Sequence, residues 1–256
     1  MIAGLGLIVG GIAAGVFGSL LGLGGGILIV PLLTLGFGLP LREAVGVSLV
    51  SVIVTSSASA GVYLQRHVAN LRLGMTLELF TAMGALIGGL LAFLLDERTL
   101  AALFAALLVY VAISMLRRPG GATEAEPGAG YVYRTQRSGL GYVGSVGAGV
   151  ISALLGVGGG LVKVPVMHLV MGVPLRMATA TSNLMIGITA SASAIIYLFR
   201  GGIDPYVAGP VAVGVFLGAS VGSRTAHRVD LRVLRTLFVL VLTYTAFEMI
   251  RKALLL

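Results

Sequence analysis

Two short glycine clusters are the parts of the sequence best suited to chemistry. Gly22-Leu23-Gly24-Gly25-Gly26 and Gly156-Val157-Gly158-Gly159-Gly160 each interrupt an apolar stretch, and a proline follows each cluster five residues later, at Pro31 and Pro165. Glycine and proline release backbone groups from a helix, and at membrane depth such groups persist only where protein or a water-filled cavity satisfies them. The free N–H groups at the start of a half-helix attract anions. The sequence therefore predicts substrate contacts at Gly24, Gly25, Gly26, Gly158, Gly159 and Gly160. The alternative is close packing of helices through small residues.

Polar side chains near the clusters extend this candidate site. Lys163 follows the second cluster by three residues, and an ammonium group there is costly at membrane depth unless it meets an anion or an acid. We expect Lys163 to coordinate an anion; the alternative is that its side chain extends to the membrane surface. Hydroxyl-rich segments follow both clusters, and most of their Ser and Thr residues are ordinary helix-packing residues. The candidate ligand contacts among them are Ser48, Thr181, Ser182 and Asn183.

Two titratable residues are candidates for carrying a coupled proton. Glu78 lies inside an apolar block, where an acid is a proton-relay candidate by default, although pairing with a basic side chain is an equal alternative. His168 could take up and release protons, but a packed, hydrogen-bonded histidine is the favoured alternative. The sequence contains neither an HExxH nor a GxSxG pattern. We therefore expect no enzyme, no cofactor and no metal site.

The composition places these residues in a lipid bilayer. Of the 256 residues, 57% are hydrophobic and 10% are charged, whereas soluble domains average roughly 45–50% and 25%. This argues against a soluble enzyme, a nucleic-acid-binding module and a disordered chain. The net charge of +8 comes from basic residues that lie mostly between apolar blocks, which indicates membrane orientation and not nucleic-acid binding. The chain has no cysteine, which excludes disulfides and cysteine-ligated metals.

The chain contains an internal repeat at an offset of 134 residues. The glycine clusters coincide at this offset, as do Pro40-Leu41-Arg42 and Pro174-Leu175-Arg176. Each half has one long glycine-interrupted apolar block and three blocks of membrane-spanning length. We therefore predict an all-α polytopic membrane protein of two inverted repeats, each with a Gly-broken helical hairpin plus three transmembrane helices. The repeats are residues 1–118 and 139–256, and residues 119–138 form a polar linker.

The loop charges favour inversion of the second repeat. If each glycine-broken block enters and leaves on one side, one face of the membrane carries eleven basic residues and the other carries five. If the block crosses once, the division is nine against seven. The positive-inside rule then predicts a multi-pass protein of the inner membrane, with the linker in the cytoplasm and both termini outside.

The motif pair resembles a known family. Two copies of G-x-G-G-G-x-x-x-x-P are each followed by a G-x-P-x-R turn, at 38–42 and 172–176, and the sequence is similar to the TauE/SafE sulfite exporters, also called toluene-sulfonate uptake permeases. The similarity extends over nearly the whole chain outside the linker and includes residues 178–183. It implies a duplicated transporter of small sulfur-containing anions, such as sulfite or sulfonates, coupled to the proton gradient. It supports the glycine clusters, both prolines and Thr181 to Asn183, but not Lys163, His168 or Glu78.

Together these features predict a secondary transporter that moves a small sulfur-containing anion by alternating access. The substrate would lie near the membrane midplane, between the glycine breaks and the hydroxyl-rich helices. Two alternatives stay open: the same fold carrying a different small solute, and a non-transporting scaffold subunit. The expected partners are the anion and membrane lipid, without nucleic acid, and GxxxG patterns permit a homodimer without requiring one.

Overall fold

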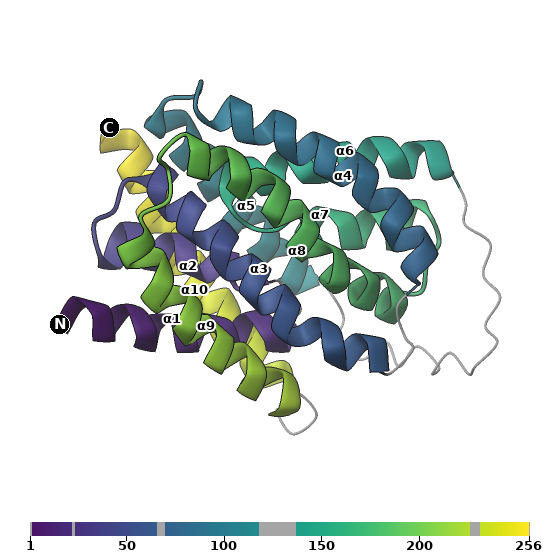
Figure 1. Ribbon diagram of the computed structural model, residues 1–256, viewed down its shortest axis with the longest axis horizontal. Helices are drawn as coiled ribbons and strands as arrows, with labels where there is room; N and C mark the ends of the chain where they lie inside the picture. Colours follow the sequence, from purple (N-terminus) through teal and green to yellow (C-terminus); the bar gives the residue numbers. More distant parts are fainter. Residues whose placement is uncertain (1, 22–23, 66–69, 118–136, 226–230, 256) are drawn as a thin grey trace.

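A computed structural model of the chain describes residues 2–21, 24–65, 70–117, 137–225 and 231–255, which contain helices and no strand (Figure 1). The first half comprises α1 (Ile2–Leu21), α2 (Gly26–Pro31), the π-helical turn η1 (Leu32–Gly36), α3 (Leu41–Gln65), α4 (Leu71–Ala92) and α5 (Glu97–Arg117). The second half comprises α6 (Ser138–Leu155), α7 (Gly160–Pro165), the π-helical turn η2 (Val166–Val170), α8 (Leu175–Phe199), α9 (Pro205–Thr225) and α10 (Leu231–Leu255). The all-α prediction is confirmed. Residues 119–136 of the expected linker lie outside the described residues.

Six of the described helices, α3, α4, α5, α6, α8 and α9, are long and apolar enough to cross a membrane. Helix α4 shows how the sequence divides its two faces. Met75, Leu79 and Met83 follow one another at i+4 spacing and are 53–69% exposed, as expected for side chains that face lipid. Glu78 and Thr81 lie on the opposite face, buried against other helices. The composition therefore corresponds to a multi-pass membrane protein that buries some polar side chains between its helices.

The helices of the two halves are interleaved. Helix α1 packs along α9 and α6 packs along α4, while α3 packs against α8 and α5 against α10. The 134-residue offset relates α1 to α6 and α4 to α9, so the α1–α9 contact corresponds to the α6–α4 contact. The same offset relates α3 to α8 and α5 to α10, so each of these two contacts corresponds to itself. Figure 1 shows α1 beginning and α10 ending on the left of the bundle, whereas α6 begins on the right.

Glycines make the interleaved contacts close. A Cβ atom on Gly84 of α4 would lie 2.1 Å from the Val146 carbonyl oxygen of α6. A Cβ atom on Gly218 of α9 would lie 2.1 Å from the Ile12 carbonyl oxygen of α1. Both pairs occur at the repeat offset, and neither leaves room for a side chain. These glycines therefore serve helix packing, as small residues do in membrane bundles.

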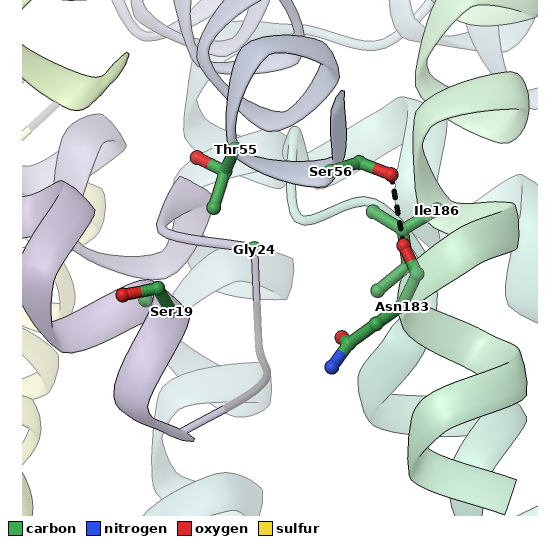
Figure 2. A pocket seen from close by; sticks show the side chains of 7 residues that line it. Ser19, Gly24, Thr55, Ser56, Asn183 and Ile186 are labelled. Carbon is green, nitrogen blue, oxygen red and sulfur yellow. Dashed lines mark hydrogen bonds between the residues drawn. The ribbon is translucent and has the colours of Figure 1, made fainter. Parts of the chain in front are cut away.

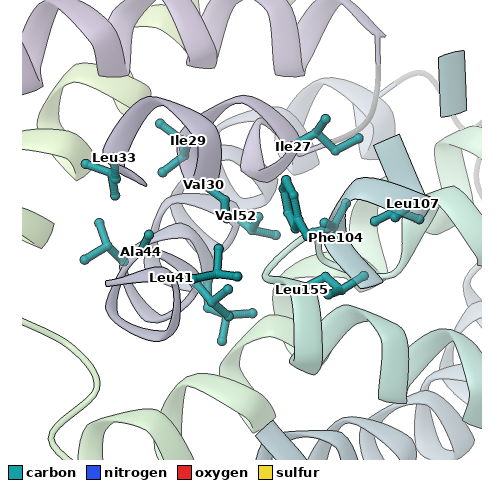
Figure 3. Packing of buried hydrophobic residues seen from close by; sticks show 14 of the residues in the cluster. Ile27, Ile29, Val30, Leu33, Leu41, Ala44, Val52, Phe104, Leu107 and Leu155 are labelled. Carbon is teal, nitrogen blue, oxygen red and sulfur yellow. The ribbon is translucent and has the colours of Figure 1, made fainter. Parts of the chain in front are cut away.

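The apolar core surrounds the first glycine break. Figure 3 shows side chains of α2 and η1 packed among residues of α3, α5 and α6. The labelled residues are Ile27, Ile29, Val30, Leu33, Leu41, Ala44, Val52, Phe104, Leu107 and Leu155. Such dense packing holds the short helix α2 in place, although six residues alone would not form a stable helix.

Candidate functional site

Each glycine cluster forms a sharp break between two helices. The backbone φ angles are +78° and +73° at Gly24 and Gly25, and +79° and +75° at Gly158 and Gly159. Glycine adopts this left-handed region without the steric cost that other residues incur. Helices α2 and α7 begin directly after the breaks, and each continues beyond its proline as a π-helical turn. Such turns are rare and frequent at functional sites. The predicted interruptions are thus present at equivalent positions of both halves.

The two breaks meet at the same pair of side chains. A Cβ atom on Gly24 would lie 3.5 Å from both Val52 Cγ1 and Ile186 Cγ2. A Cβ atom on Gly158 would lie 2.6 Å and 2.5 Å from the same two atoms. Val52 of α3 and Ile186 of α8 are related by the 134-residue offset, and both are buried. Each half therefore contributes one glycine break and one apolar side chain to this contact.

Ser48 joins the two breaks directly. Its hydroxyl oxygen lies 2.7 Å from the Gly156 carbonyl oxygen and 3.2 Å from that of Gly26. The nearer acceptor, Gly156, is at the C-terminal end of α6, where an interrupted helix leaves carbonyl groups without partners. At membrane depth such groups need a donor from the protein. Ser48 was predicted as a ligand contact, and here its hydroxyl serves the contact between the halves.

A small polar cavity opens beside the crossing, the place where the two glycine breaks meet (Figure 2). Its free volume is about 10 Å³, which is close to the minimum that holds one water molecule. Ser56 donates to the Asn183 carbonyl oxygen at 2.8 Å and accepts from the Gly187 N–H at 3.1 Å. The side-chain amide of Asn183 extends from α8 toward the Gly24 side (Figure 2). The lining residues are Gly18, Ser19, Gly24, Thr55, Ser56, Asn183 and Ile186.

A buried ion pair joins the two halves. The Lys163 ammonium of α7 contacts the Glu78 Oε2 atom of α4, and the two side chains are 1% and 5% exposed. The Thr189 hydroxyl of α8 donates to Glu78 Oε1 at 2.5 Å. Charges at such depth are costly unless they are paired and hydrogen-bonded. The structure thus brings together the predicted anion ligand and one predicted proton carrier, and the alternative that Glu78 pairs with a basic side chain is confirmed.

This ion pair has no counterpart at the repeat-related positions. At the repeat offset, Glu78 corresponds to Ala212 and Lys163 to Ile29, so the repeat-related pair of positions carries no charge. Thr189 corresponds to Thr55, which lines the cavity. The two halves therefore share a backbone design but carry different charges.

The predicted cluster Thr181 to Asn183 divides its contacts among three neighbours. The Thr181 hydroxyl accepts from the backbone N–H of Asn70, at 2.9 Å, beside the start of α4. The Ser182 hydroxyl faces Gly160, 3.4 Å from the position of a Cβ atom there. Asn183 lines the cavity. Only Ser182 and Asn183 thus remain near the breaks.

Two buried hydroxyls beside the second break have no hydrogen-bond partner among the residues described. They belong to Ser152 of α6 and Ser182 of α8. The Ser152 Cβ atom lies 3.3 Å from the position of a Cβ atom on Gly159. A buried hydroxyl without a partner costs free energy, so each such group needs an explanation. Both hydroxyls are donors that a small anion at the second break could use.

The second proton-carrier candidate, His168, lies apart from the ion pair in η2. Its Nδ1 atom is 2.9 Å from the Val173 carbonyl oxygen, and the side chain is half-buried. The alternative of a packed, hydrogen-bonded histidine is therefore confirmed. Within the described part of the chain, no cluster of His, Asp or Glu side chains could hold a metal ion.

Inspection of the sequence alone does not identify Val52, Ile186 or Ser152 as site residues. Val52 and Ile186 share the repeat offset, and this is the signal that could have found them. Ser152 corresponds to Gly18 in the first half, so the repeat gives no signal for it.

Comparison with known proteins agrees with this architecture. The family model described as Sulfite exporter TauE/SafE matches residues 7–249. The probable membrane transporter protein YunE of Bacillus subtilis is 25% identical, over 95% of this chain and 96% of its own length. YdhB of the same organism, also named a probable membrane transporter, is 26% identical over 87% and 90%. A probable membrane transporter of Methanocaldococcus jannaschii is 29% identical over 75% and 71%. No solved structure matches significantly. The chain therefore belongs to the sulfite exporter TauE/SafE family of membrane transporters.

Proposed function

We propose that the chain is a secondary transporter that moves a small sulfur-containing anion across the inner membrane by alternating access. The observation that carries this proposal is the meeting of the two glycine breaks at Val52 and Ile186, with a polar cavity beside them. Helix breaks at equivalent positions of two repeats are the usual place of a substrate site in transporters. The substrate class follows from the family to which the chain belongs.

The polar groups around the crossing favour an anion over a cation. No carboxylate lines the cavity among the described residues. The available groups are mainly donors: the Asn183 amide and the unpartnered hydroxyls of Ser152 and Ser182. Glu78, the buried acid, is already engaged by Lys163 and Thr189. The backbone of both breaks adds N–H groups of the kind that bind anions.

The arrangement of the halves supports alternating access. The repeat offset exchanges the α1–α9 and α6–α4 contacts, and α1 and α6 begin at opposite ends of the bundle in Figure 1. This supports inverted repeats, in which the two halves exchange roles as the site opens to one side and then to the other. With the charge bias of the loops, it also supports a cytoplasmic linker at 119–138 and termini outside the cell.

Flux into liposomes that contain the purified protein tests the proposal. Sulfite, thiosulfate, sulfate, sulfoacetate and taurine are offered separately, with chloride as the reference anion. We expect selective uptake of at least one sulfur oxyanion. Uptake no faster than into empty liposomes for all of them would refute an anion transporter and favour the scaffold alternative. Uptake confined to an uncharged or zwitterionic solute would favour a different cargo.

A substitution in the cavity tests the position of the site. Asn183→Leu removes an amide of similar size. A hydrogen bond to a charged group contributes about 1.5–3 kcal/mol, so we expect anion affinity to fall roughly 10- to 100-fold. The matched control is Ser57→Ala, on the exposed side of α3, where the hydroxyl bonds only to Ile53 of its own helix. Equal affinity in both variants would exclude the Asn183 amide from the site.

A further inference from the structure

The ion pair of Glu78 and Lys163 holds the only buried cation among the described residues, and Lys163 follows the second glycine break by three residues. Lys163 is 1% exposed and its ammonium already has an anionic partner. A substrate anion therefore cannot use Lys163 unless Glu78 first releases it. This raises the question of what neutralises Glu78 when the anion arrives.

We propose that Glu78 is an internal substitute for the substrate: its carboxylate pairs with Lys163 in the empty site, and one proton binds to Glu78 when the anion takes its place. This inference rests on the proposed function and deepens it, because it assigns both the coupling ion and its stoichiometry. The proton adds to a Glu78 carboxylate oxygen, Lys163 stays an ammonium, and no covalent bond breaks.

The charge balance of the site is the physical reason. The empty site holds one carboxylate and one ammonium, so its net charge is zero. With a monovalent anion bound and Glu78 protonated, it holds one anion and one ammonium, and the net charge is again zero. If the anion entered while Glu78 stayed ionised, the site would carry an uncompensated negative charge at membrane depth, which is costly.

The neighbouring groups suit such an exchange. The Thr189 hydroxyl that donates to Glu78 Oε1 can also accept from a protonated carboxyl, because a hydroxyl has both capacities. Ser182 and Thr189 lie seven residues apart on α8 and therefore on the same face of that helix. The unpartnered hydroxyls of Ser152 and Ser182 supply donors that an arriving anion would satisfy.

Few other titratable groups face Glu78. Helix α4 packs against α6 and α8 and meets α7 through the ion pair. The described titratable side chains on these neighbours are Tyr142 of α6, stacked on Phe80, and Tyr197 of α8, which donates to the Ala153 carbonyl. His168 in η2 is bonded to Val173. Glu78 is thus the one carboxylate beside Lys163 among these residues. Because the repeat-related positions are Ala212 and Ile29, the proposal predicts one proton and not two.

Calorimetric titration of the purified wild-type protein measures the coupling directly. The probe is methanesulfonate, a monovalent anion that does not titrate near neutral pH, in two buffers with different ionisation enthalpies. The buffer dependence of the heat gives the number of protons taken up for each anion bound. We expect about one proton for methanesulfonate where Glu78 is ionised in the empty site, and an affinity that weakens about ten-fold for each unit of pH increase there.

Variants identify the group that takes the proton. Glu78→Gln should abolish proton uptake and make anion affinity independent of pH. Glu248→Gln is the matched control, because Glu248 pairs with Arg251 at 3.0 Å near the end of α10, and it should behave as the wild type. Lys163→Met should lose binding at every pH. If Glu78→Gln does not fold, the wild-type titration still decides whether a proton is taken up.

The outcomes separate this inference from the proposed function. Anion binding without proton uptake and without pH dependence would overturn the exchange at Glu78 and leave the anion site intact. Proton uptake that persists in Glu78→Gln would assign the proton to another group and also overturn it. Failure of the wild type to bind or transport any of the anions would overturn the proposed function, and the exchange with it.

Discussion

Replacing Gly26 with alanine tests whether the two halves meet at the glycine breaks. The backbone at Gly26 lies outside the left-handed region, so alanine adds a methyl group without conformational strain. That methyl group would lie 2.3 Å from the Gly156 carbonyl oxygen and 2.8 Å from the Ser48 hydroxyl oxygen. The carbonyl belongs to the backbone of the other half and can yield only if the second break moves. The substitution therefore acts on the contact between the halves.

The expected loss of stability has two parts. Overpacking of a close-packed interior costs about 1–3 kcal/mol. Loss of the Ser48 hydrogen bond adds about 1 kcal/mol. For a chain of this size each kcal/mol lowers Tm by roughly 2–4 °C, so we expect Tm to fall by roughly 5–15 °C.

The assay is thermal unfolding of both proteins in the same detergent, followed by circular dichroism. Gly147→Ala, on α6, is the matched control, because a Cβ atom at this position would have no atom within 4 Å outside its own stretch of helix. Alanine is favoured over glycine inside a helix by about 1 kcal/mol, so this control should be as stable as the wild type or slightly more. If Gly26→Ala unfolds at the temperature of the control, the two breaks are not in contact and the crossing at Ser48 is wrong.

Three further predictions concern other parts of the molecule. Gly159→Leu places a side chain at φ +75° beside the proposed site, and liposome flux should be lost in a protein that still purifies as a folded species; normal flux would remove the second break from the site. Tyr197→Phe removes a buried hydroxyl that donates to the Ala153 carbonyl at 3.0 Å and should lower stability by about 1 kcal/mol, seen as a lower Tm, whereas an unchanged Tm would show that this bond adds no net stability. The hydrogen bond from the Thr99 hydroxyl holds the pKa of Asp96, outside the membrane-spanning segments, below its usual value. The ionised Asp96 carboxylate therefore stabilises the fold fully above the pKa that Asp96 has in the unfolded chain, and this stabilisation is lost as pH falls through its lowered folded-state pKa. Asp96→Asn should remove that part of the pH dependence of Tm.

Much of the fold follows from the sequence because its signals are local. Apolar length gives the spanning helices, and the glycine clusters with Pro31 and Pro165 mark the breaks. The repeat offset gives two equivalent halves. Each of these signals depends on residues that are neighbours in the chain or on a fixed spacing, so no knowledge of tertiary contacts is needed.

The site could be predicted only in part. Gly24, Gly158 and Asn183 lie at the centre of the molecule or its cavity, as expected from the motifs. Thr181 belongs to the same motif, yet its hydroxyl accepts from the start of α4. Successive residues on a helix point in different directions, so a run of three polar residues does not identify which of them faces the site.

The sequence by itself determined the all-helical membrane architecture, the two halves and the positions of their glycine breaks. The tertiary structure decided which helices are neighbours: α1 lies against α9, and Glu78 meets Lys163 from 85 residues away. In a bilayer every spanning helix is apolar on its outside, so hydropathy does not specify partners. Partner choice depends on the fit of small residues and on the pairing of the few buried charges, and both are properties of the folded chain.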